Sequence, residues 1–142
     1  MTEAAEHLQS IEIQSASYWF DTKIDVSREH AYEIAVIFPA PGTPDAVRDW
    51  MLSINDLSGW PGWAKIIGSV FFFLRRNPFE PWFALMATVD RKHPQRLCSG
   101  LPYCPRDSGR LICYFNDSPW AYGNNYGSVL LKVKDLGMLE KR

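Results

Sequence analysis

One loop near the C-terminus carries residue types that bind a hard cation. Asp117, Asn124 and Asn125 lie between two strand-like runs, residues 111–114 and 129–133, on a segment interrupted by a proline and glycines. Calcium usually takes about six to eight oxygen ligands from carboxylates, amides and backbone carbonyls. A carboxylate followed by two neighbouring asparagines can therefore enclose an ion from two sides of a loop. The same residues are also typical of a long hairpin in which asparagine and glycine serve only the turn.

The order of residues in this loop is similar to that of one family. Asn-Asp-x-Pro-x-x-Tyr-Gly-Asn-Asn-x-Gly-Ser, over residues 116–128, resembles the calcium and sugar loop of the small bacterial galactose-binding lectins of the PA-IL-like family. That family folds as a jelly-roll β-sandwich, and its calcium ion bridges the protein and two sugar hydroxyls. The resemblance implies calcium ligands from the side chains of Asp117, Asn124 and Asn125 and from the backbone carbonyl of Ala121. It also implies sugar contacts by Asp117 and Asn124.

Two family features are not assigned to residues here. The lectins also hold the sugar with a histidine and a glutamine before a central strand, whereas His93-Pro94-Gln95 follows the strand predicted over residues 82–89. The family takes a further backbone carbonyl from an earlier loop, whose counterpart lies between Phe38 and Gly62. The sequence therefore supports the metal site more directly than galactose specificity.

Three tryptophans could have a role in sugar binding. Indole rings offer a broad apolar face with a polar edge, which suits the C–H face of a sugar. Trp120 lies inside the loop and is the candidate sugar platform, with packing beneath the loop as an equal alternative. For Trp60 and Trp63, packing is the favoured interpretation.

The composition excludes several classes of protein. The chain has 142 residues and a formal net charge of −1, with no lysine–arginine stripe that would favour nucleic acid. No apolar stretch approaches the roughly 20 residues of a membrane span. The acidic, polar N-terminus is unlike a signal peptide, which makes the cytoplasm the default expectation while the compartment stays open.

Neither a disulfide framework nor a catalytic constellation is predicted. The three cysteines are an odd number, although a bond between Cys98 and Cys104 is left open. Asp49 and Asp56 flank a tryptophan, an arrangement that could suit glycoside hydrolysis, but solvated carboxylates are the favoured interpretation. With no nucleophile elbow or phosphate-binding loop in the chain, the protein is predicted not to be an enzyme.

The hydrophobic pattern predicts a single domain over residues 1–142, built mainly from strands. The predicted strands are residues 11–14, 17–24, 31–38, 82–90, 110–116 and 128–136. A short helix is expected over residues 44–54, and residues 65–76 read as a second helix or a strand. With the resemblance, the expected fold is all-β: a galactose-binding-like jelly-roll β-sandwich with a helical insertion over residues 44–76.

The expected function is that of a non-enzymatic, calcium-dependent carbohydrate-binding module. One ion and a shallow site give modest affinity, so the effect would require several sites, through a homo-oligomer or many copies on a partner. The alternative is an accessory or protein-interaction β-sandwich that keeps the metal loop for structure alone. In that alternative the aromatic-rich segment before residue 76 would face a protein or membrane.

Overall fold

The computed structural model describes residues 8–40, 43, 46–49, 52–57, 59–60, 64, 74–77, 80, 82–98, 100–118 and 122–139. Nearly all regular structure in these residues is β. The longer strands are β1 (Leu8–Gln14), β2 (Phe20–Val26), β3 (His30–Ile37), β6 (Leu85–Val89), β7 (Lys92–Arg96), β8 (Gly109–Phe115) and β10 (Ser128–Met138). The short strands are β4 (Arg48–Asp49), β5 (Leu52–Ser53) and β9 (Asn125–Tyr126), and a 3-10 turn, η3 (Tyr122–Asn124), precedes β9.

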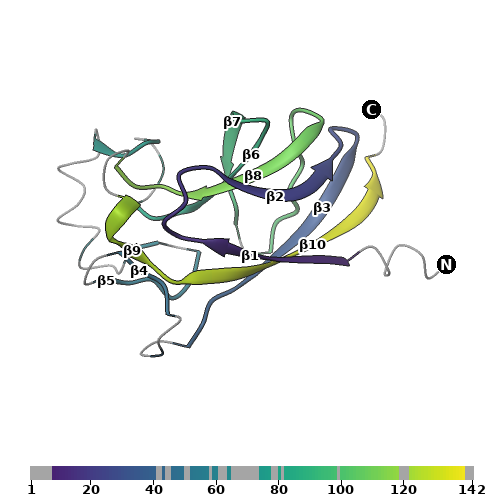
Figure 1. Cartoon of the computed structure of the whole chain (residues 1–142). Helices are drawn as coiled ribbons and strands as arrows, with labels where there is room; N and C mark the ends of the chain where they lie inside the picture. Colours follow the sequence, from purple (N-terminus) through teal and green to yellow (C-terminus); the bar gives the residue numbers. More distant parts are fainter. Residues whose placement is uncertain are drawn as a thin grey trace.

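The strands form three antiparallel sheets. One has the order β1-β10-β3, the second β2-β8-β6-β7 and the third β5-β4-β9. The first two sheets form the two layers of a sandwich-like arrangement, and the small third sheet lies at one end of it (Figure 1). The third sheet is the part of the fold that positions the candidate site.

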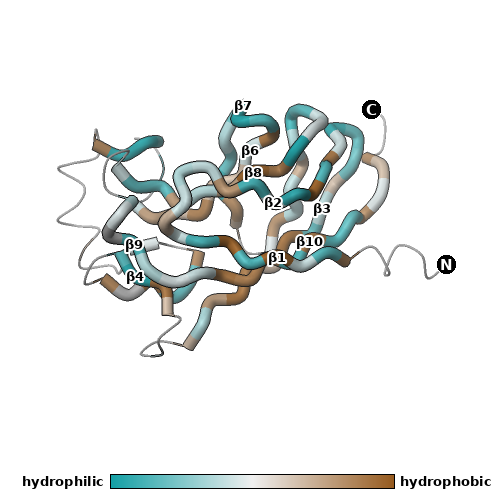
Figure 2. The backbone as a smooth tube through the Cα atoms, in the orientation of Figure 1, coloured by the Kyte–Doolittle hydropathy of each residue, from teal (hydrophilic) through white to brown (hydrophobic). Residues whose placement is uncertain are grey.

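The main core lies between the two larger sheets. β10 buries alternate residues, Val129, Leu131 and Val133, as expected for a strand with one face on a core. Leu85 and Leu111 of the second sheet belong to the same buried cluster. Figure 2 shows hydrophobic residues along the inner strands β10 and β8, whereas the edge strand β7 is hydrophilic. A polar edge strand discourages pairing with other chains.

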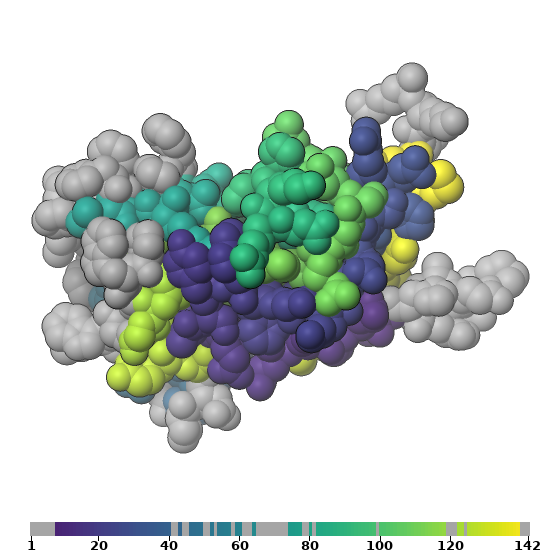
Figure 3. Space-filling view, turned by 45° about the horizontal axis from the view of Figure 1, so that its top comes forward, coloured from purple at the N-terminus to yellow at the C-terminus, as the bar shows by residue number. Residues whose placement is uncertain are grey.

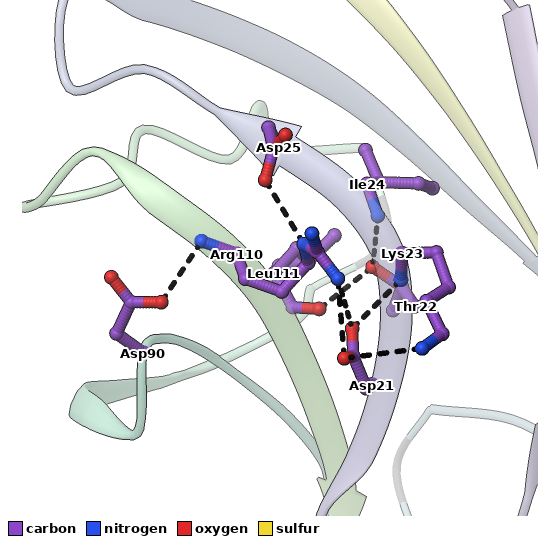
Figure 4. A network of polar contacts seen from close by, with 8 residues as sticks. All are labelled: Asp21, Thr22, Lys23, Ile24, Asp25, Asp90, Arg110 and Leu111. Carbon is purple, nitrogen blue, oxygen red and sulfur yellow. Dashed lines mark hydrogen bonds and ion pairs between the residues drawn. The ribbon is translucent and has the colours of Figure 1, made fainter.

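Side chains bridge an irregular stretch between β2 and β8. The pairing register shifts between Asp21 and Asp25, and Thr22 Oγ1 donates to the carbonyl of Leu111 at 2.7 Å within that stretch. The Arg110 guanidinium donates to Asp25 at 3.0 Å and to Asp21 at 3.2 Å (Figure 4). These exposed ion pairs each contribute little to stability. They connect β8 to β2 on both sides of the register shift.

Every predicted strand is present, with ends shifted by a few residues. β7 was not predicted because Lys92–Arg96 is almost entirely exposed and has no apolar alternation. The strands β4, β5 and β9 have two residues each, too few for an alternating pattern to be visible. The sequence therefore indicates the all-β class but not the third sheet.

The helix predicted over residues 44–54 is wrong wherever the structure describes this segment. Arg48–Asp49 and Leu52–Ser53 form the antiparallel pair β4–β5, closed by a hydrogen bond from Ile54 N to Val47 O at 2.9 Å. Val47 and Ile54 are both buried. Burial at the two ends of a short hairpin mimics the apolar spacing of a helix, which explains the wrong prediction.

Three further expectations can be compared with the structure. All three cysteines are free, so the bond left open between Cys98 and Cys104 is not formed. No helix in the described residues is long and apolar enough to cross a membrane. Most of the segment 65–76, expected as a helix or a strand, lies outside the described residues.

Candidate functional site

Asn116 fixes the point where the candidate loop leaves β8. Its side chain is fully buried; its Oδ1 accepts the Asn77 amide at 2.8 Å and its Nδ2 donates to the Asn77 carbonyl at 3.0 Å. Its backbone bonds the other side, with Asn116 N donating to Ala84 O at 2.8 Å and Phe83 N to Asn116 O at 2.6 Å. Such a fully bonded residue holds the adjacent Asp117 in one place.

Arg76 ties the two ends of the loop together. Its backbone amide donates to the carbonyl of Asp117 at 2.9 Å, and its Nη1 donates to the hydroxyl of Tyr122 at 3.0 Å. That hydroxyl in turn donates to the carbonyl of Phe115. Asp117 follows β8, and Tyr122 begins η3, so one residue fixes both flanks of the segment between them.

The Arg76 guanidinium is surrounded by aromatic rings. Its central carbon lies 3.6 Å from the ring centre of Tyr18, 3.7 Å from Tyr114 and 4.1 Å from Trp19. Tyr122 is a fourth ring, at 5.6 Å. A cation over ring faces is stabilised by the negative face of each ring, more so when water is excluded. This aromatic nest makes the Arg76 anchor rigid.

The amide of Asn125 has a defined orientation. Its Nδ2 donates to the carbonyl of Ser15 at 3.1 Å, and a carbonyl can only accept, so the oxygen Oδ1 must be on the other side of the amide. Oδ1 is buried, and no described residue is its hydrogen-bond partner. Figure 3 shows the segment around β9 against the N-terminal strands on this face of the molecule. The fold thus holds one amide oxygen of Asn125 buried and unsatisfied.

Asp117 supplies a second unsatisfied oxygen. The residue is 3% exposed, its Oδ1 accepts the Ser118 amide at 2.7 Å, and its buried Oδ2 has no hydrogen-bond partner within the described ranges. Burial, and secondly the charge of Asp49, raise the pKa of Asp117 to about 7, while the Ser118 amide and the Asn125 side chain lower it part of the way. Within the described residues, no positive charge lowers the pKa of this carboxyl group.

Asp49 brings a second carboxylate to the same place. It is 6% exposed and lies directly opposite Asn125 in the β4–β9 pair. Its Oδ2 accepts the indole N–H of Trp60 at 2.8 Å. Burial raises the pKa of Asp49, and the Trp60 hydrogen bond lowers it only in part.

Trp60 is itself held in place by its neighbours. It stacks on Trp82 with ring centres 4.6 Å apart, and its backbone amide donates to the Trp82 carbonyl at 3.1 Å. Gly59 has φ +85°, and a Cβ there would meet the Trp82 carbonyl oxygen at 2.1 Å, so this close approach requires glycine. Trp60 also packs against the main core, which confirms the packing interpretation for this residue.

The structure brings together two of the residues predicted for the loop. Asp117 and Asn125 are close neighbours, and both are buried. Asn124 lies in η3, and its side chain is outside the described part of the structure. Trp120 and Ala121 lie outside the described residues, as does Trp63. Their predicted roles therefore stay predictions.

The sequence did not identify Asp49 as part of this site. In the sequence, Asp49 is considered only together with Asp56, as a possible pair of carboxylates for glycoside hydrolysis. The structure separates the environments of the two, since Asp49 is buried and Asp56 is exposed. Asp49 is far from Asn125 in the chain, and no local pattern announces the pairing of β4 with β9.

The donor set has the chemistry that a hard cation takes. Two buried carboxylates and one buried amide oxygen gather here, and an unsatisfied buried polar group costs roughly 1–3 kcal/mol. Calcium accepts oxygen ligands in flexible numbers and geometry, and would satisfy Asp117 Oδ2 and Asn125 Oδ1 together. The residues present therefore fit calcium.

The site is assigned from its own residues. Within the described ranges, no group of three or more histidine, cysteine, aspartate or glutamate side chains is arranged to hold a metal. A site here must therefore combine carboxylates with amide and backbone oxygens. Comparison of the chain with protein-family models and with curated proteins finds no match.

Proposed function

We propose that this protein is a calcium-dependent, non-enzymatic carbohydrate-binding module with a galactose-binding-like jelly-roll fold. The observation that carries the proposal is a pair of buried oxygens, Asp117 Oδ2 and Asn125 Oδ1, that have no hydrogen-bond partner among the described residues. Native proteins seldom leave such groups unsatisfied. An ion bound between them would explain both.

The ion would be held by the loop and would leave positions for the sugar. Asp117 and Asn125 would be ligands through side chains, joined by Asn124 and the backbone carbonyl of Ala121 as the lectin resemblance implies. Calcium usually takes about six to eight oxygens, more than these residues supply. Two neighbouring sugar hydroxyls are the oxygen ligands that would complete the set, with Trp120 as the candidate platform for the sugar ring.

The rival function is an accessory or protein-interaction sandwich in which the loop is only structural. A structural loop should satisfy its own polar groups, as Asn116 does through five hydrogen bonds to its neighbours. Asp117 and Asn125 do not follow that rule. This contrast, within one short segment, favours the ion-binding function.

Calcium is expected to stabilise the protein and to enable sugar binding. At a free calcium concentration about 100 times its dissociation constant, the free energy of unfolding should rise by roughly 2.7 kcal/mol. Thermal unfolding with and without a chelator measures this, and magnesium is the control because it demands a smaller octahedral shell.

The sugar part of the proposal is tested separately on a glycan array. Binding, first of galactose-type glycans, should appear with calcium and disappear with chelator. Calcium stabilisation without any glycan signal would indicate a structural metal site. Glycan binding that survives the chelator would contradict a calcium-mediated mechanism.

A further inference from the structure

The strand pairing places Asp49 beside the two unsatisfied oxygens. Residues directly opposite in an antiparallel pair project to the same side of the sheet, with Cβ atoms about 4.5–5.5 Å apart. Asp49 and Asn125 are such a pair. Both side chains are more than nine-tenths buried, so they share one buried face of the small sheet.

One oxygen of the Asp49 carboxylate is already engaged. Oδ2 accepts the Trp60 indole N–H at 2.8 Å, and Trp60 is fixed by its stack on Trp82. A carboxylate has roughly four lone-pair directions on its two oxygens. The hydrogen bond therefore orients the group while leaving Oδ1 available, as outer-shell donors do for metal-binding side chains.

In the part of the chain that the structure describes, no positive side chain compensates the two carboxylates. Among the described residues, no lysine or arginine contributes to the pKa of Asp49 or Asp117. Arg76, the nearest anchor of the loop, directs its guanidinium into the aromatic nest. Two like charges brought together in a buried place require a cation between them, or a proton, to be stable.

We propose that Asp49 is a direct ligand of the calcium ion, so that the site has two carboxylates from segments far apart in the chain. This inference rests on the proposed calcium function. It makes the β4 strand, and not only the loop after β8, part of the metal site. Binding the ion would then join the third sheet to the end of β8.

The test is calcium calorimetry and thermal unfolding of three variants. Asp49→Asn keeps an acceptor for Trp60, so the fold should survive, and we expect calcium affinity to fall at least tenfold. Without calcium this variant should be as stable as the wild type or more stable, because the repulsion from Asp117 is gone. Its stabilisation by calcium should shrink. The control Asp56→Asn, on the exposed carboxylate of the same segment, should behave like the wild type.

A third variant separates ligation from a simple effect of charge. Asp49→Glu keeps the charge but displaces the carboxylate by one methylene. If Asp49 is a direct ligand, the calcium affinity of this variant should stay below that of the wild type. Wild-type affinity in Asp49→Asn or in Asp49→Glu would overturn the inference. If affinity depends on Asp117 and not on Asp49, this inference alone fails. If the wild-type protein binds no calcium, the proposed function fails as well.

Discussion

Asp117→Asn is expected to lower calcium affinity by one to two orders of magnitude, roughly 1.4–2.7 kcal/mol. Asp117 is the only carboxylate of the loop, and its Oδ2 has no other partner. Asparagine keeps the shape and an acceptor for the Ser118 amide, but it removes the full charge that faces the ion. Calorimetric titration of the metal-free protein measures the change, with Asp56→Asn as the control.

The same substitution should change how metal-free stability depends on pH. The folded-state pKa of Asp117 is raised from 3.8 to about 7, so between these pH values the folded protein binds more protons than the unfolded chain. Stability should therefore rise as pH falls from about 8 toward 5. Between pH 8 and pH 5 about two pH units lie below the raised pKa, so the free energy of unfolding should change by on the order of 3 kcal/mol, at about 1.4 kcal/mol per pH unit.

Chelator-treated protein unfolded with urea at several pH values measures this trend. Asp117→Asn should make the metal-free stability less dependent on pH and should raise it near pH 8. In the wild type, saturating calcium should reduce the gain in stability at low pH, because the ion binds the deprotonated carboxylate. Metal-free stability that falls steadily from pH 8 to pH 5 would contradict a buried, uncompensated Asp117.

Arg76→Met is expected to destabilise the protein by roughly 2–4 kcal/mol. The variant removes a guanidinium enclosed by Tyr18, Trp19 and Tyr114, and desolvated cation–π contacts reach about 2 kcal/mol. It also removes the hydrogen bond to Tyr122 at 3.0 Å. Calcium affinity should decrease less than in Asp117→Asn, because the Arg76 backbone amide still holds the Asp117 carbonyl.

Chemical denaturation of Arg76→Met is best compared with two other variants. Arg91→Met is the matched control, since Arg91 is exposed and lies over the ring of Trp19 at 5.1 Å, and its loss should cost less than about 1 kcal/mol. Arg76→Lys should recover only part of the stability, because an ammonium lacks the planar surface that stacks between rings. Equal, small effects at Arg76 and Arg91 would show that the aromatic nest is not a structural anchor.

The long strands could be predicted because each buries one face over several residues. β10 has apolar residues at Val129, Leu131 and Val133, with half-buried residues between them, and the chain shows this alternation directly. The third sheet could not be predicted in the same way. Asp49 and Asn125 meet only through a pairing of two-residue strands, and long-range pairing of such short segments leaves no local pattern.

Within the site, residue types were predictable and their environment was not. The sequence of the loop is enough to show that Asp117 and Asn125 carry side-chain oxygens that can bind a metal ion. Their environment depends on Ser15 and Arg76, which come from other parts of the chain. The aromatic nest around Arg76 likewise combines three distant segments, so the short cluster Arg75-Arg76 reads as solvated charge in the sequence alone.

The most direct test of the account is a calorimetric titration of calcium into chelator-treated, folded wild-type protein. We predict saturable binding of a single ion per chain with micromolar to millimolar affinity, and a further heat of binding when a galactose-type sugar is added to the calcium-loaded protein. The titration should be repeated with magnesium, which we expect to bind much more weakly. No calcium binding at millimolar concentration by a protein that remains folded would contradict the proposed metal site and the function built on it.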